Sequence, residues 1–235
     1  MFIDKYQLDY IEKDTRSDQN PEYVVIWLHG LGADCNDFVP IVNEIKLDVC
    51  VKFVFPNAPV MPITINNGHA MRSWYDIYSL TNIDNMIDKN GLKLSVNLVD
   101  DLIQYYVKNG YQTTDIILAG FSQGGSVIYQ ALSSLNYKIR GAVILSSYMV
   151  DPNNFVINTI NKNASILVCH GKLDDVVSYE LGLSSYNVLH KNGYHALWMQ
   201  YLIGHSVSKD LIHDLESWFN DLLVKKEFKK AIHSH

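Results

Sequence analysis

A serine between two nearby glycines is the side chain best placed for chemistry in this sequence. Ser122 lies in the stretch LAGFSQGGSV, two residues after Gly120 and two residues before Gly124. This G-x-S-x-G spacing can form a sharp turn between a strand and a helix, which exposes the serine hydroxyl as a nucleophile at a helix N-terminus. A plain strand-to-helix turn with a capping serine would have the same residues. The nucleophile hypothesis therefore depends on partners elsewhere in the chain.

The partners of a nucleophilic serine are a base and a carboxylate that orients the base. When the serine lies on such a turn, the known order along the chain is serine, acid and then histidine. His205 directly follows the apolar run 196–202, so we predict it to be the base. Asp174 and Asp175 both follow the apolar run 165–170, and their spacing leaves either of them as the acid.

The other histidines after Ser122 fit the role of base less well. Some of them lie within predicted helices, at the start of a strand or in the C-terminal tail. One precedes the acid in the chain, and we expect it to have a packing role. They are His170, His190, His195, His213, His233 and His235.

Backbone amides must also be available to stabilise the negative charge that develops on an attacked carbonyl oxygen. One candidate is the amide of Gln123, the residue after the nucleophile. The other is the amide of Leu31, which lies between Gly30 and Gly32 in a turn that follows the apolar run 23–28. Each of these signals is weak alone, but three of them at strand ends, in the right order, are jointly strong.

The elements that must position these residues alternate along the chain. Continuous apolar runs at 23–28, 51–55, 115–119, 141–146, 165–170 and 196–202 predict buried strands. Amphipathic segments at 92–109, 122–135, 179–192 and 209–224 predict helices. This alternation predicts an α/β fold with a mostly parallel sheet covered on both faces, in one domain that spans 1–235. Ligands bind beyond the carboxyl ends of such strands.

One long segment, from residue 56 to about residue 91, interrupts the alternation. A loop of this length in a compact domain is usually functional, and we expect Met71 and Trp74 to line an apolar acyl pocket. A second hypothesis is that the 56–80 loop moves and makes transient contact with a membrane surface. The residues it would expose are Met61, Ile63 and Ile65. The alternative is a rigid wall, and the same apolar loop could instead serve a homodimer.

Composition excludes several classes of function. The net charge of −6 leaves no basic face for nucleic acid. Residues 1–14 have charges throughout and do not resemble a signal peptide, and no apolar run approaches the roughly 20 residues of a membrane-spanning helix. The three cysteines lack metal-ligand spacing and favour a reducing cytoplasm.

Taken together, several stretches resemble the acyl-protein thioesterase and carboxylesterase family, the phospholipase/carboxylesterase group of α/β-hydrolases. They are LHGLGAD, FPNAPVMPITINNGHAMRSWYDI, GFSQGGSV, CHGKLDDVV and YLIGHSV, in this order over nearly the whole chain. The resemblance implies the α/β-hydrolase fold, and it selects Asp174 over Asp175 because the family reads H-G-x-x-D at this point. It also implies Ser122 as nucleophile and His205 as base, with oxyanion amides at Leu31 and Gln123.

Three residues depart from the usual pattern of that family. Lys172 stands where an acidic residue is common, Asp175 where proline is common, and Leu202 replaces the proline of Y-P-x-G-H. None of these departures changes a catalytic residue type.

The expected activity is hydrolysis of carboxylic esters or thioesters with apolar acyl chains, through an acyl-enzyme intermediate. No metal ion or organic cofactor is needed for this chemistry. The expected substrate is a small-molecule ester or an acylated protein. The alternatives are a lysophospholipase-like lipid esterase, and a catalytically silent hydrolase fold that binds a lipid or a partner protein.

Overall fold

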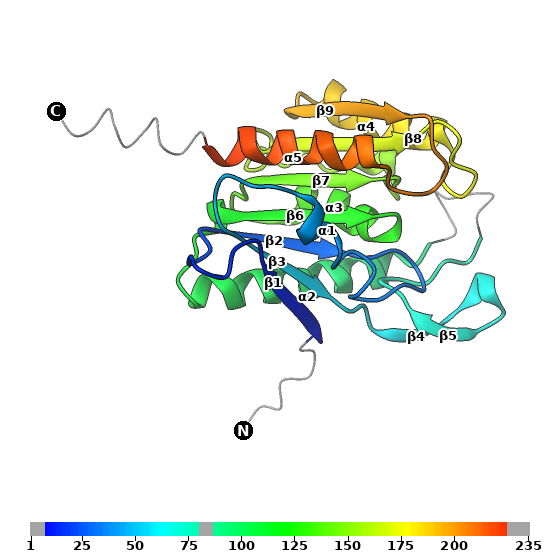
Figure 1. Ribbon diagram of the computed structural model, residues 1–235. Helices are drawn as coiled ribbons and strands as arrows, with labels where there is room; N and C mark the ends of the chain where they lie inside the picture. Colours follow the sequence, from blue (N-terminus) through cyan, green and yellow to red (C-terminus); the bar gives the residue numbers. More distant parts are fainter. Residues whose placement is uncertain (1–7, 80–86, 225–235) are drawn as a thin grey trace.

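The computed structural model describes residues 8–79 and 87–224, and within them seven strands form one sheet (Figure 1). The spatial order is β1-β3-β2-β6-β7-β8-β9. The strands are β1 (Tyr10–Asp14), β2 (Tyr23–Leu28), β3 (Val51–Pro56), β6 (Ile116–Phe121), β7 (Gly141–Leu145), β8 (Ser165–Gly171) and β9 (Ala196–Tyr201). Strand β1 is antiparallel to β3 and the other neighbours are parallel, which confirms the predicted α/β fold class.

Helices cover both faces of this sheet (Figure 1). One face carries α2 (Lys89–Lys108), α3 (Gln123–Ser134) and α4 (Tyr179–Lys191), and the other carries α1 (Ile41–Glu44) and α5 (Lys209–Val224). Alternate residues of β2 point to opposite sides, because Ile26 packs into the first layer and Trp27 into the second. A strand buried on both faces needs apolar residues at every position, which explains the continuous apolar runs.

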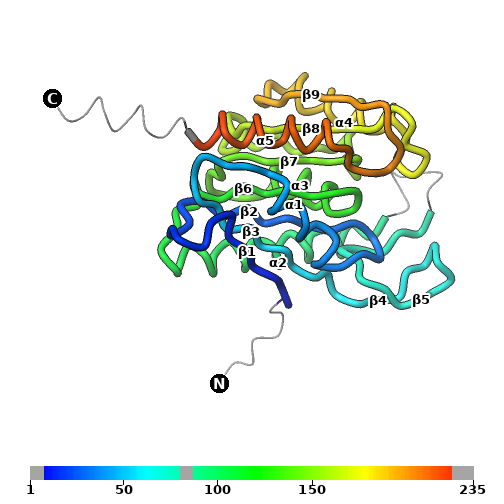
Figure 2. The backbone as a smooth tube through the Cα atoms, in the orientation of Figure 1, coloured from blue at the N-terminus to red at the C-terminus, as the bar shows by residue number. Residues whose placement is uncertain are grey.

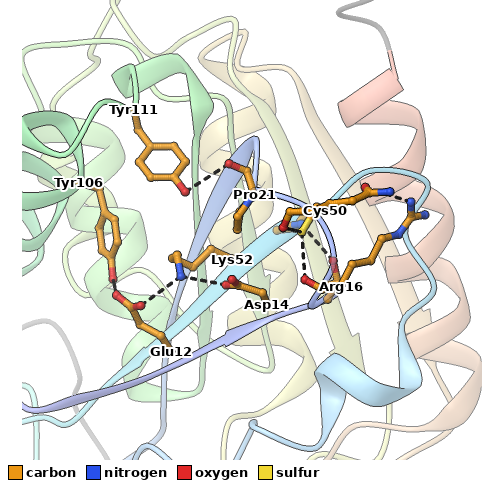
Figure 3. Close-up of polar contacts among 11 residues, drawn as sticks. Glu12, Asp14, Arg16, Pro21, Cys50, Lys52, Tyr106 and Tyr111 are labelled. Atoms are coloured by element: carbon orange, nitrogen blue, oxygen red, sulfur yellow. Dashed lines mark hydrogen bonds and ion pairs between the residues drawn. The ribbon is translucent and has the colours of Figure 1, made fainter.

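The six predicted strands are all present within a residue or two of their expected ends, but β9 is only partly buried because it lies at the sheet edge, and β1 was not predicted. Three of the five residues in its sequence, YIEKD, are charged, so it gives no continuous apolar run. Those charges are used at the sheet edge, where Lys52 Nζ lies 3.1 Å from a Glu12 carboxylate oxygen and 2.9 Å from Asp14 (Figure 3). The Tyr106 hydroxyl of α2 donates to the other Glu12 oxygen, so this cluster fastens β1 to both β3 and α2.

The segment predicted as a long loop instead contains a two-stranded antiparallel hairpin. Strands β4 (Val60–Ile63) and β5 (His69–Arg72) pair with each other and lie beyond the carboxyl ends of the main sheet (Figures 1 and 2). Side chains alternate between the two faces of this hairpin, so Val60 is 62% exposed whereas Ile63 is completely buried. The expectation that Ile63 is exposed toward a membrane was therefore wrong, and Ile65 is half-buried against the core.

Helix α2 also begins earlier than predicted, at Lys89 rather than at residue 92. The Asp88 carboxylate accepts a hydrogen bond from the Gly91 amide at 2.8 Å and so caps the helix N-terminus. The helix ends at Lys108, close to the predicted end at residue 109, and Gly110 follows with a φ of +104°. Among the described residues, no helix is long and apolar enough to span a bilayer.

Candidate active site

Ser122 lies on a strained turn between β6 and α3. Its backbone has a φ of 54° and a ψ of −120°, which a residue with a Cβ rarely adopts. A methyl group added at Gly120 would lie 2.5 Å from the Gly124 carbonyl carbon, and one at Gly124 would lie 2.5 Å from the Leu28 carbonyl oxygen. Strand and helix therefore approach so closely that the two glycines of the motif are required by packing.

Backbone contacts hold this turn while leaving the serine side chain unengaged. The Ser122 amide donates to the Leu145 carbonyl oxygen at 2.9 Å, and the Ser122 carbonyl accepts from the Ser147 hydroxyl at 2.6 Å. The Ser122 side chain is half-buried, and its hydroxyl has no hydrogen-bond partner among the described residues. The hydroxyl is thus available to a substrate carbonyl.

The structure brings together the predicted base and acid at the same end of the sheet. His205 Nδ1 lies 2.8 Å from Asp174 Oδ2. The other carboxylate oxygen of Asp174 accepts from the amides of Val176 at 3.0 Å and Val177 at 2.8 Å. Since a carboxylate only accepts, His205 Nδ1 must be the donor, which leaves Nε2 free to take a proton. Asp175, the other candidate acid, is exposed.

The imidazole of His205 also lies beside the serine turn. Its ring centroid is 4.7 Å from that of Phe121, the residue directly before Ser122. The His205 side chain is 16% exposed, so it borders solvent, whereas the Asp174 carboxylate is fully buried. No hydrogen bond joins Ser122 to His205 within the described chain, and contacts of this kind often tighten only when substrate binds.

The two predicted oxyanion amides are both available. Gln123 is the first residue of α3, so its amide has no carbonyl to pair with inside the helix. The Leu31 amide likewise has no partner among the described residues. The turn that carries Leu31 abuts the nucleophile, because a methyl group added at Gly30 would lie 3.3 Å from Ser122 Cβ. The arrangement therefore offers two free N–H donors next to Ser122.

The side chain of Gln123 has a role that sequence reasoning missed. It is buried, and its Oε1 accepts from the Trp74 amide at 2.9 Å while its Nε2 donates to the Tyr75 carbonyl at 2.7 Å. Its Nε2 also donates to the Ser73 hydroxyl at 2.9 Å. The side chain of Gln123 thus fixes residues 73–75, while the backbone amide of the same residue is one of the two proposed oxyanion donors. A glutamine in an otherwise apolar and small-residue stretch was the available signal.

His29 is a second missed residue, and it fastens the oxyanion turn. Its Nδ1 donates to the Gly30 carbonyl at 2.7 Å, and its Nε2 accepts from the Ala58 amide at 3.0 Å. A neutral imidazole satisfies both contacts at once, and burial lowers the pKa of His29 from its ordinary value. The turn after β2 is therefore tied to the base of the β4–β5 hairpin.

The two residues predicted to line an acyl pocket occupy different environments. Trp74 is fully buried, and its Nε1 donates to the His29 carbonyl at 2.9 Å, so it supports the oxyanion turn from inside. Met71 is half-buried beside that turn, because a methyl group added at Gly32 would lie 3.6 Å from the Met71 sulfur. Contact of either residue with substrate stays a prediction.

Three exposed apolar side chains that sequence reasoning did not identify lie on the two loops that carry Asp174 and His205. Leu173, Val176 and Leu202 are all exposed, Leu202 by 77%. The Leu173 amide donates to the Ile203 carbonyl at 3.0 Å, which holds the loop after β8 against the loop after β9. Among the described residues, no group of three or more histidine, cysteine or acidic side chains is arranged to hold a metal ion.

Comparison with known proteins adds to this geometry. The family described as phospholipase/carboxylesterase matches residues 12–223 of the chain. Acyl-protein thioesterase 1 of Cryptococcus neoformans var. neoformans serotype D is 32% identical over 219 residues, which cover 85% of this chain and 92% of that protein. Acyl-protein thioesterase 1 homolog 1 of Dictyostelium discoideum is 30% identical, with 92% and 96% covered. The crystal structure of Arabidopsis thaliana SOBER1 has a TM-score of 0.78 at 28% identity and covers 86% of this chain and 99% of that one.

Proposed function

Because this chain belongs to the phospholipase/carboxylesterase family of α/β-hydrolases, we propose that it hydrolyses esters and thioesters with Ser122 as nucleophile, His205 as base and Asp174 as the orienting acid. The observation that carries this assignment is the hydrogen bond of 2.8 Å between His205 and Asp174 at the sheet edge where Ser122 adopts its strained turn. Strain at a turn with a free hydroxyl is typical of a functional site.

The proposed reaction has two halves. In the first, His205 Nε2 takes the Ser122 proton as Oγ attacks the acyl carbon, and the amides of Leu31 and Gln123 stabilise the oxyanion. His205 then gives that proton to the departing alcohol or thiol, which leaves an acyl group on Ser122. In the second half, His205 takes a proton from water, the hydroxide attacks the acyl-enzyme, and Ser122 recovers its proton as the carboxylic acid leaves. Asp174 stabilises the imidazolium in both halves.

The proposed substrates carry an apolar acyl group. The exposed side chains of Leu173, Val176 and Leu202 provide apolar surface on the loops that carry the acid and the base, and Met71 lies beside the oxyanion turn. The relatives named acyl-protein thioesterase support an acylated protein as the substrate, with small esters as the alternative. Turnover of matched thioesters and oxyesters across chain lengths separates these substrates from a lysophospholipase-like preference for lipid esters.

Contact of the β4–β5 hairpin with a membrane surface remains part of the proposal. Its test must use an exposed residue, because Ile63 is buried and a charge there would disrupt the hairpin. Val60→Asp is suitable, since Val60 is 62% exposed. Equal co-sedimentation of wild type and Val60→Asp with anionic liposomes would end the membrane hypothesis. A mass measurement in solution tests the homodimer, and a cytoplasmic location stays a prediction.

The test of the catalytic assignment is covalent labelling by a fluorophosphonate probe. We expect Ser122→Ala to lose labelling and to lose roughly 10⁴-fold or more in turnover. Ser134→Ala is the matched control, because Ser134 is an exposed serine on the same helix whose hydroxyl bonds only to the Gln130 carbonyl. Labelling of Ser122→Ala at the wild-type rate would refute the assignment. Failure of the wild type to label would favour the catalytically silent module.

A further inference from the structure

A second imidazole lies behind the proposed acid. His170, near the end of β8, is completely buried. Its Nε2 lies 2.9 Å from the Val177 carbonyl oxygen and 3.6 Å from Asp174 Oδ2. Both of these atoms are acceptors. A carbonyl oxygen can only accept a hydrogen bond, and the Asp174 carboxylate already accepts one from His205. His170 Nε2 must therefore carry a proton.

The other ring nitrogen of His170 has no room for a proton and its acceptor. Nδ1 has no hydrogen-bond partner among the described residues. Helix α4 packs directly against it, since a methyl group added at Gly182 would lie 2.2 Å from Nδ1. A proton on Nδ1 would be buried without an acceptor, so the imidazole is restricted to one neutral form.

The charges around His170 do not change that conclusion. Asp174 and Glu180 favour the charged imidazole, whereas His205 opposes it. Desolvation is the largest influence, and burial lowers the pKa of His170 below its ordinary value. His170 therefore presents a permanent N–H group, and not a second positive charge, to the acid.

The contacts of Val177 make His170 part of the support of the acid. The Val177 amide donates to Asp174 Oδ1 at 2.8 Å, and the Val177 carbonyl accepts from His170. The loop that donates to Asp174 Oδ1 is thus held by the His170 imidazole, which lies on the side of Asp174 Oδ2. Asp174 Oδ2 lies between two rings, His205 at 2.8 Å and His170 at 3.6 Å.

We propose that His170 is a positioning residue of the hydrolase, a neutral N–H donor that fixes the Asp174 loop and shares the charge of Asp174 Oδ2 with His205. This inference rests on the proposed function. It goes beyond packing, because a ring that only filled space would have no effect on how strongly Asp174 acts on His205.

The decisive variant is His170→Phe, which keeps a flat aromatic ring against Trp198 and removes the N–H group. Without that donor, Asp174 acts more strongly on the His205 imidazolium, so we expect the acid limb of the kcat/KM profile to move to higher pH. We also expect kcat to fall about tenfold as the loop loosens, with KM within about twofold of the wild type. His170→Gln places an amide N–H near the original Nε2, and we expect it to restore most of both properties.

Trp198→Phe is the matched control for packing. The Trp198 ring is stacked on His170 with centroids 6.0 Å apart, and its indole N–H has no partner among the described residues. The substitution therefore alters the packing of His170 without removing a hydrogen bond, and we expect the acid limb to stay in place. If His170→Phe does not fold, His170→Leu removes the same N–H group with a smaller apolar side chain and carries the same expected shift.

The proposal is overturned if the acid limb of His170→Phe, or of His170→Leu in its place, stays at its wild-type position or moves to lower pH. It is also overturned if His170→Gln departs from the wild type as far as His170→Phe does. Fluorophosphonate labelling of the wild-type enzyme is measured in parallel. Loss of that labelling would indicate failure of the proposed function, whereas labelling with an unmoved acid limb would indicate failure of this inference alone.

Discussion

The strained backbone of Ser122 predicts that the nucleophile is held at a cost to stability. Its φ of 54° and ψ of −120° suit glycine but bring the Cβ of any other residue too close to its own backbone. Strain of this kind is worth about 1–3 kcal/mol. Ser122→Gly removes it, whereas Ser122→Ala keeps the Cβ and therefore the strain. Both variants lose the hydroxyl, so their difference isolates the backbone.

The expected difference follows from two opposing contributions. Relief of the strain stabilises the folded glycine variant, and the greater freedom of glycine in the unfolded chain removes about 0.4–1 kcal/mol of that gain. We therefore expect Ser122→Gly to be about 1 kcal/mol more stable than Ser122→Ala. For a chain of 235 residues this corresponds to a rise in Tm of about 2–4 °C.

Urea unfolding followed by circular dichroism, supported by calorimetry, measures this difference. Equal m-values for the two variants are required, so that the change in midpoint reports stability and not compactness. Neither variant should hydrolyse ester above background. If Ser122→Gly is no more stable than Ser122→Ala, the turn is not strained in the way that its dihedral angles indicate, and the argument fails.

Three further outcomes are expected. Gln123→Ala should lower the free energy of unfolding in urea by about 2–4 kcal/mol, because it leaves buried backbone groups of residues 73–75 unpaired. A loss of stability below about 0.5 kcal/mol would contradict this expectation. Burial lowers the pKa of His29 and of His170 in the folded protein. Their contribution to stability is therefore complete above the pKa of histidine in the unfolded chain, about 6.5, and is lost as the pH falls below that value. The loss is up to about 1.4 kcal/mol per pH unit for each histidine. Equal unfolding free energies at pH 7.5 and pH 5.5 would disagree. Tyr106→Phe should lower stability by about 1 kcal/mol by removing the bond to Glu12, and an unchanged thermal midpoint would show that this contact contributes nothing (Figure 3).

The sequence was informative wherever the fold imposes a simple pattern. Strands buried on both faces must be apolar at every position, so five buried strands could be located from their continuous apolar runs, and the half-buried edge strand β9 was located by the same pattern. Their parallel order brings the carboxyl ends to one edge, which is why Ser122 and His205 could be selected by position. The spacing did not separate Asp174 from Asp175, since adjacent residues in a loop are distinguished only by backbone direction.

The other elements could not be predicted, because they form through contacts between residues that are far apart in the sequence. Strand β1 is polar and becomes a strand only through its contacts with β3 and α2. The hairpin contains Pro62, which argues against a strand until the hairpin is seen to have two free edges. The burial of Ile63 follows from the register of that hairpin, and no local pattern of residues fixes the register.

Buried neutral groups, and not surface ion pairs, hold the proposed catalytic residues. Gln123 fixes the segment 73–75, His29 fixes the oxyanion turn, and His170 fixes the loop of the acid. Gln123 and His29 each connect two loops that follow different strands, whereas His170 connects the end of β8 to the loop that follows it, so together they convert the shared edge of the sheet into a defined arrangement of atoms. Hydrogen bonds of buried groups are little affected by salt, and an unpaired buried partner is costly, so the arrangement resists small displacements. The G-x-S-x-G turn places the hydroxyl, but the geometry around it depends on these three polar side chains, and for this reason the short motif alone was a weak signal.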